Sequence, residues 1–163
     1  HMVAEKYRLI GPTMEQPEYS MFHREKLENE YLQIFKNIGL GTTIWSPLAA
    51  GVLTGKYNNG IPDDSRLAIA GFDWLVTKQL NEQRIEKVRK LTSIANELGS
   101  SMAALAIAWC AYNANVSSVI LGATKAAQLH QNLEALDVLP KLNTEVMENI
   151  ETILQNKPVL PEW

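Results

Sequence analysis

Apolar residues recur along this 163-residue chain at two spacings, one typical of amphipathic helices and the other of short buried strands. The clearest helical pattern covers residues 82–98 and ends at Gly99, and its inner stripe is Ile85, Val88, Leu91, Ala95 and Leu98. The same reasoning predicts four further helices: 24–38, a helix capped by Ser100 or Ser101 that runs to Tyr112, 125–136, and a C-terminal helix capped by Thr144.

Strand patterns alternate with these helices. A short strand is predicted within residues 11–19, a buried β-branched strand over 42–45, and a third over 116–121. Helices between strands indicate an α/β fold with a parallel sheet, in which ligand sites lie at the carboxyl ends of the strands. Three strands cannot close a barrel. The pattern therefore fits either a small open α/β domain or a piece of a larger barrel.

Residues 49–81 carry no clear periodicity and are rich in glycine and turn-forming residues. Structureless segments of this length inside compact chains are commonly functional. This segment is therefore predicted to be a lid.

Composition excludes several functions. The net charge of −3 gives no basic footprint for nucleic acid, and no apolar run is long enough for a transmembrane segment. None of the three histidines has a second residue at metal-ligand spacing. The single cysteine, Cys110, lies in an apolar run and is interpreted as a buried core residue, which fits a cytoplasmic location.

The first residues suggest how the chain divides. His1 and Met2 are interpreted as a cloning scar, and the amphipathic residues that follow lack a helix start signal, as if the chain entered in mid-helix. The expected division is a scar at 1–2, one α/β unit over 3–158, and a tail at 159–163.

The first candidate binding segment follows the second strand. The Trp45 ring offers a flat surface for a heteroaromatic group, while Ser46 and the backbone amides of 48–51 are suited to a pyrophosphate. Lys56 and Arg66 add positive charge. Each residue alone is more often a core tryptophan or a solvated surface cation, so the argument depends on their combination.

Two further strand ends carry polar residues. The third strand enters a helix through Gly122, Ala123 and Thr124, and a helix N-terminus of this kind attracts an anion. Lys125 and Gln128 follow at positions suited to a ribose phosphate, although the pattern taken alone is more often an ordinary helix cap at Thr124 followed by solvated residues. Gln16, after the first strand, has an amide that suits a carboxamide.

In this order, the segments resemble the aldo-keto reductases. The motifs are Gln16-Pro-Glu-Tyr19, Trp45-Ser-Pro-Leu-Ala49 with Gly51 and Gly55-Lys56-Tyr57, Leu105-Ala-Ile-Ala-Trp109, and Val119-Ile-Leu-Gly122-Ala123 with Gln128 and Asn132. The resemblance covers about Ile10 to Pro158. Glu18-Tyr-Ser-Met-Phe22 and Val138-Leu-Pro140 look most like the voltage-gated potassium channel beta-subunit branch of this family.

The resemblance implies a fold and a cofactor. The fold is the C-terminal part, about three βα units, of a (β/α)8 TIM barrel, and the cofactor is NADP(H). The implied cofactor-binding residues are Gln16 and Trp45 at the nicotinamide, Ser46, Pro47, Leu48, Ala49, Gly51 and Lys56 at the pyrophosphate, and Arg66, Gly122, Thr124, Gln128, Gln131 and Asn132 at the adenosine end. Segment 49–81 would close over the cofactor as a clasp. Asp64 stands close to this region, where its charge would disfavour a phosphate.

The resemblance also implies that the catalytic half of the family is missing from this chain. The family uses a tyrosine acid supported by Lys, Asp and His, and none of the tyrosines here lies in that motif. The first hypothesis is thus the cofactor-binding portion of a carbonyl reductase, inactive alone, whose parent acts on a small carbonyl substrate. The second is a channel beta subunit that senses redox state through bound NADPH beside a pore-forming partner. The third is an assembly unit that forms a homo-oligomer.

Overall fold

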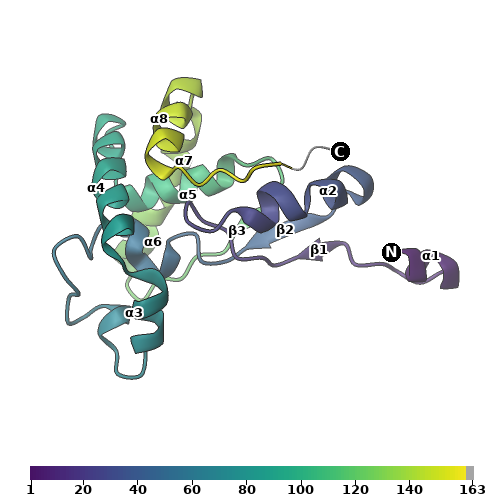
Figure 1. Cartoon of the computed structure of the whole chain (residues 1–163), viewed down its shortest axis with the longest axis horizontal. Helices are drawn as coiled ribbons and strands as arrows, with labels where there is room; N and C mark the ends of the chain where they lie inside the picture. The colour runs from purple at the N-terminus through teal and green to yellow at the C-terminus, as the bar shows by residue number, and fades with distance from the viewer. Residues whose placement is uncertain (161–163) are drawn as a thin grey trace.

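The computed structural model describes residues 1–160 and contains a parallel sheet of three short strands (Figure 1). The strands are β1 (Met14–Glu15), β2 (Gly41–Ile44) and β3 (Ser118–Val119), and they lie side by side in the order β1-β2-β3. Met14 is opposite Gly41 in the first pair, and Thr43 is opposite Ser118 in the second. The prediction of a parallel α/β sheet is confirmed.

Helices make up most of the described chain. Their bounds are α1 Met2–Tyr7, the π-helical turn η1 Lys26–Glu30, α2 Leu32–Ile38, the 3-10 segments η2 Ala49–Thr54 and η3 Arg66–Ala68, α3 Asp73–Gln79, α4 Glu82–Glu97, α5 Met102–Tyr112, α6 Ala126–Leu133, α7 Ala135–Val138, the 3-10 turn η4 Leu139–Lys141, and α8 Thr144–Leu154.

The helices cover one face of the sheet and leave the other open (Figure 1). Because side chains alternate along a strand, Thr42 and Ile44 point the same way, and both are fully buried. Trp45 is 41% exposed. Strands that follow one another in space as they do in sequence, with their helices on one face, are arranged as in the wall of a barrel. A doubly wound sheet would have helices on both faces.

Helix α5 is the centre of the core. Every residue from Ala104 to Cys110 is buried, so this helix is apolar on all sides and must be surrounded by other elements. It contacts α4, α6, α7, η2 and β3. The Ser101 hydroxyl caps it by accepting a hydrogen bond from the Ala104 amide at 3.2 Å. The predicted helix to Tyr112 and its serine cap are therefore confirmed.

Helix α4 also agrees with its prediction, while three other helices differ. Predicted helix 24–38 is divided into η1 and α2, and its last residue, Ile38, is exposed although it is apolar. Predicted helix 125–136 is divided between α6 and α7 at Glu134. The cap of α8 is Asn143, whose Oδ1 accepts from the Val146 amide at 2.9 Å, so the assignment of Thr144 as the cap was wrong.

The prediction that residues 49–81 form an irregular lid is wrong for most of the segment. It contains η2, η3 and α3, and it contributes buried side chains to the core: Ala49, Val52, Leu53, Tyr57, Leu67 and Leu75. These apolar residues follow no regular period because they lie on short turns rather than on one long helix. Residues 59–61 and 63–64 are exposed.

Among residues 1–160, no single helix has both the length and the apolar character needed to cross a membrane. The pair α4 and α5 meets both criteria only when joined, and it is bent by 88°.

Candidate functional site at the carboxyl ends of the strands

The carboxyl ends of all three strands meet at one edge of the sheet. The Trp45 amide donates to the Pro17 carbonyl at 3.0 Å, and the Tyr19 amide donates to the Trp45 carbonyl at 3.2 Å. On the other side, the Ile120 amide donates to the Ile44 carbonyl at 2.9 Å. Parallel pairing thus brings the segments after residues 15, 44 and 119 together, as the sequence predicted.

Trp45 presents its indole at this edge. The side chain lies on the open face of the sheet, whereas its strand neighbour Ile44 is fully buried on the helix-covered face. Gln16 is also exposed. It lies two residues before Glu18, which forms an isolated parallel bridge with Trp45 beyond the ends of β1 and β2. A half-exposed indole beside an exposed amide can hold a planar group that carries hydrogen-bonding substituents.

The chain after Trp45 makes a tight left-handed turn. Ser46, Ala49, Ala50 and Gly51 have φ values of 61°, 47°, 57° and 93°. A Cβ on Gly51 would lie 2.8 Å from Lys56 Cε and 3.0 Å from Lys56 Nζ, so only glycine lets the lysine lie against the turn. Within the turn, the Ala49 amide donates to the Ser46 carbonyl and the Gly51 amide donates to the Leu48 carbonyl, both at 2.9 Å. Lys56 is therefore the group of this segment that offers free donors to an anion.

Buried residues support this turn from the core side. Pro47 and Ala49 are buried, while Ser46 and Leu48 are partly exposed. Tyr57 is buried beneath the turn, and its hydroxyl donates to the Ala50 carbonyl at 3.4 Å. The turn is therefore part of the folded core rather than a mobile loop.

At the third strand end, Gln128 caps the start of α6. Its Oε1 accepts from the Thr124 amide at 2.8 Å, the Thr124 hydroxyl at 3.2 Å and the Lys125 amide at 3.3 Å. Gly122 and Thr124 are exposed. Gln128 thus occupies donors that an anion would also use, which the sequence did not indicate.

An ion pair connects the second and third strand ends. Lys125 Nζ lies 3.3 Å from Asp64 Oδ2, and both side chains are largely exposed. Asp64 had been expected to disfavour a phosphate here, and the structure gives it a partner 61 residues away in sequence. Arg66 follows and lies with its guanidinium carbon 5.7 Å from the centre of the Phe72 ring.

The remaining candidates, Gln131 and Asn132, lie on α6. Gln131 is exposed, but Asn132 is only 5% exposed and offers little surface to a ligand. Within residues 1–160, no group of three or more His, Cys, Asp or Glu side chains is placed to hold a metal ion.

Comparison with known proteins assigns this arrangement to a family. The sequence model of the Aldo/keto reductase family matches residues 2–155. The chain belongs to the aldo/keto reductase family. The resemblance drawn from the motifs is confirmed.

Two curated relatives of this aldo/keto reductase chain carry the same name, "Probable voltage-gated potassium channel subunit beta". The one from Arabidopsis thaliana is 52% identical over 160 residues, which is 98% of this chain and 49% of the relative. The one from Oryza sativa subsp. japonica is 54% identical over 157 residues, which is 96% of this chain and 48% of the relative. The chain therefore spans about half the length of the curated relatives it matches.

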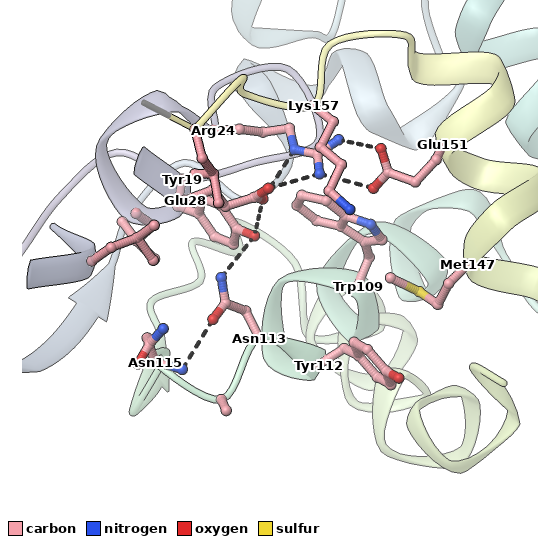
Figure 2. Close-up of a pocket in the computed structure, with 14 residues that line it drawn as sticks. Tyr19, Arg24, Glu28, Trp109, Tyr112, Asn113, Asn115, Met147, Glu151 and Lys157 are labelled. Atoms are coloured by element: carbon pink, nitrogen blue, oxygen red, sulfur yellow. Dashed lines mark hydrogen bonds and ion pairs between the residues drawn. The ribbon is translucent and has the colours of Figure 1, made fainter. Parts of the chain in front are cut away.

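The aldo/keto reductase chain has a second polar cluster, on the helix side of the sheet, that sequence reasoning missed (Figure 2). Arg24 donates to both oxygens of Glu28, at 2.9 and 2.7 Å, and to both oxygens of Glu151, at 2.7 and 2.8 Å. Its last donor reaches Asn156 Oδ1 at 3.2 Å. All five N–H donors of the guanidinium are therefore used. The partners lie up to 132 residues apart, so no local motif indicates them.

Aromatic side chains enclose this cluster. Trp109 lies below Arg24, with 5.1 Å between the guanidinium carbon and the ring centre, and stacks on Tyr19 at 5.2 Å. The Tyr19 hydroxyl donates to Glu28 Oε1 at 2.7 Å and accepts from the Asn113 amide at 3.1 Å. Burial, reinforced by the charge of Glu28, raises the pKa of Tyr19. A cavity of about 420 Å³ lies beside the cluster.

Proposed function

We propose that this chain is the NADP(H)-binding portion of an aldo-keto reductase and that the complete domain reduces carbonyl compounds by hydride transfer. It would form about three βα units from the C-terminal part of a (β/α)8 barrel. The observation that carries the proposal is the convergence, at one sheet edge, of the exposed Trp45 indole with the left-handed turn that holds Lys56.

The proposed cofactor contacts come from the segments that follow all three strands. Trp45 stacks on the nicotinamide ring and Gln16 bonds its carboxamide. The turn at 48–51 and Lys56 hold the pyrophosphate, because the turn permits close approach and the ammonium supplies positive charge there. Arg66, Thr124 and Gln128 hold the adenosine phosphate, for which Gln128 exchanges its present bonds to the α6 start.

The bound nicotinamide supplies the hydride, and the proton must come from outside this chain. Among the tyrosines, Tyr19 donates its hydroxyl proton to Glu28 on the helix side of the sheet, and Tyr57 donates its own to the Ala50 carbonyl. Neither is placed to protonate a carbonyl compound beside Trp45. The chain alone is expected to bind cofactor and to show no aldehyde turnover, because hydride and proton donors must be held in register.

A titration of the chain with NADPH, followed by tryptophan fluorescence, tests the proposal. Wild type should show saturable quenching, and Lys56→Ala should weaken binding about tenfold because it removes a charge-assisted phosphate contact. Trp45→Ala should weaken binding and remove the quenching component due to the nicotinamide. NADH should bind more weakly than NADPH, because it lacks the phosphate assigned to Arg66, Thr124 and Gln128.

Matched controls use exposed residues of the same kind elsewhere. Trp74 lies exposed on α3 and Lys36 lies exposed on α2, so Trp74→Ala and Lys36→Ala should leave the affinity unchanged. Wild type without saturable quenching, or site and control variants with equal affinities, would contradict the proposal.

A second candidate function is that of a potassium channel beta subunit, which the names of both curated relatives favour. In this alternative the bound nucleotide reports redox state to a pore-forming partner. Co-purification of the complete domain with the cytoplasmic domain of a channel would support it. Robust aldehyde turnover without such binding would support the reductase instead.

A further inference from the structure

An exposed turn between η2 and η3 carries the only Asn-Gly pair in the chain, Asn59-Gly60. Both residues are exposed, and they form the tip of the turn that begins at the buried Tyr57. Gly60 has a φ value of 118°, and a Cβ built on it would meet no atom within 4 Å. The pair therefore lies in open surroundings, in a backbone conformation that favours glycine.

Asparagine is thermally labile, and an asparagine that precedes glycine can lose its side-chain amide without an enzyme. The backbone nitrogen of the glycine attacks Cγ of the asparagine, and a C–N bond forms. The Cγ–Nδ2 bond breaks, and ammonia leaves with the amide proton of the glycine. Water then opens the cyclic imide at either carbonyl and yields aspartate or isoaspartate. Glycine favours the reaction because it has no Cβ to hinder the approach of its nitrogen.

The structure leaves the Asn59 side chain free to reach this geometry. Within residues 1–160 no side-chain hydrogen bond holds it, whereas the carbonyl of its neighbour Asn58 accepts from Arg89 Nη2 at 2.5 Å. The Gly60 amide donates to the Tyr57 carbonyl at 3.2 Å, the long end of the ordinary range, and this bond must open before the nitrogen attacks. The turn is thus fixed up to Asn58, and the reacting pair lies just beyond the fixed part.

The other asparagines lack these conditions, because each of them precedes a residue that has a side chain. The Oδ1 atom of Asn58 is enclosed. The Asn113 amide donates to the Tyr19 hydroxyl at 3.1 Å, and Asn132 is only 5% exposed. Asn96 is exposed but lies in α4, where the helix fixes the backbone around it.

We infer that Asn59 is a site of spontaneous deamidation, with water as the only co-reactant. The product adds one negative charge to the formal net charge of −3. Asn59 lines a cavity of about 600 Å³ together with Arg89, so the new carboxylate forms near a cation. The isoaspartyl product directs the main chain through the former side chain and lengthens the turn by one methylene. This inference goes beyond the proposed function, because the reaction needs no nucleotide.

Incubation of the 163-residue chain in mildly alkaline buffer, followed by ion-exchange chromatography at intervals, tests the inference. A more acidic species should accumulate, and mass spectrometry should place the change in peptide 57–66, which trypsin releases by cleavage after Lys56 and Arg66. A methyltransferase specific for isoaspartate should label the acidic species but not the fresh chain. Asn59→Gln should slow formation of this species by about tenfold or more, because the longer side chain closes a larger and less favourable ring.

The matched control is Asn96→Gln, at an exposed position, which should leave the rate unchanged. Asn59→Asp supplies the aspartyl product as a reference for peptide 57–66. Circular dichroism should show wild-type folding for each variant, since the substituted side chains are exposed. The chain unfolded in urea gives the rate that the sequence alone allows, and the folded chain should react within about tenfold of that rate.

Three outcomes overturn the inference. The folded chain may be inert while the unfolded chain reacts, which would mean that the fold protects Asn59. The first acidic product may lie at another asparagine, or Asn59→Gln may react as fast as wild type. None of these outcomes depends on nucleotide binding, so NADPH titration of the unmodified chain still tests the proposed function separately.

Discussion

The helix-side cluster around Arg24 and the strand-end edge around Lys56 differ in the exposure and hydrogen bonding of their cations. Arg24 is 5% exposed, and all five of its donors are used by neighbouring side chains. At the strand ends, Lys56, Arg66 and Lys125 are exposed, and the contact from Lys125 to Asp64 at 3.3 Å is largely in solvent. The donors of Arg24 all have partners within the chain, whereas the exposed cations at the strand ends keep donors available to a ligand.

The difference separates charges that hold the fold together from charges that can bind a ligand. Burial by itself would lower the pKa of Arg24, but hydrogen bonds and charges from Glu151 and Glu28 outweigh it and raise the pKa. A buried cation of this kind has no capacity for a further anion, and removing it leaves two carboxylates facing each other. Exposed cations are stable without a partner and therefore remain free to meet phosphates.

The largest expected effect comes from Arg24→Met. It should lower the free energy of unfolding by about 3–5 kcal/mol, because Glu28 and Glu151 lose their shared counterion while partly buried. Urea unfolding followed by circular dichroism measures this change. The folded fraction should bind NADPH with nearly wild-type affinity, since the cluster lies on the other side of the sheet.

Two variants sharpen that result. Arg89→Met, which removes an exposed pair with Glu82, should cost no more than about 1 kcal/mol. Adding Glu28→Gln and Glu151→Gln to Arg24→Met should restore part of the lost stability, because neutral amides no longer repel each other. A cost for Arg24→Met no larger than that of Arg89→Met would remove the distinction between the two regions.

An intermediate effect is expected from alkaline pH, which acts on the buried region. Burial raises the pKa of Cys110 above its ordinary value of 9.0 and that of Tyr19 above 10.0. Both groups stay protonated in the folded chain but ionise in the unfolded chain. Their stabilising contribution is therefore complete below pH 9 and is lost as the pH rises, by up to about 1.4 kcal/mol per pH unit for each group.

Urea unfolding between pH 7 and pH 11 measures this loss. Cys110→Ala should flatten the part of the decline that begins near pH 9, and Tyr19→Phe the part that begins near pH 10. If both variants keep the wild-type pH dependence, the alkaline loss has another origin.

The smallest expected effect is that of Asp64→Asn at the strand-end edge. Stability should change by less than about 1 kcal/mol, because the pair with Lys125 is exposed. NADPH affinity should rise severalfold, since a carboxylate near the phosphates is removed and Lys125 is released. Asp137→Asn on α7 is the control. Weaker binding by Asp64→Asn would mean that the ion pair organises the edge instead of competing with the cofactor.

The sequence by itself determined the elements whose signals are local. The inner stripe of α4, the apolar run of α5 with its Ser101 cap, and the β-branched strand before Trp45 all follow from the spacing of neighbouring residues, so their prediction required no knowledge of distant contacts. The alternation of strands and helices was sufficient for a parallel sheet, and with it for the meeting of Gln16, Trp45 and Gly122 at one edge.

Only the tertiary structure decided which side chains share an environment. Arg24 meets Glu151 across 127 residues and Lys125 meets Asp64 across 61, and no periodicity encodes contacts at such separations. The burial of Ala49, Val52, Leu53 and Tyr57 also escaped prediction, since these residues lie on short turns whose direction is set by packing against α4 and α5. Helix and strand preferences depend on neighbouring residues and can be recognised in the sequence. The partner of a charged side chain, in contrast, depends on how all the elements pack.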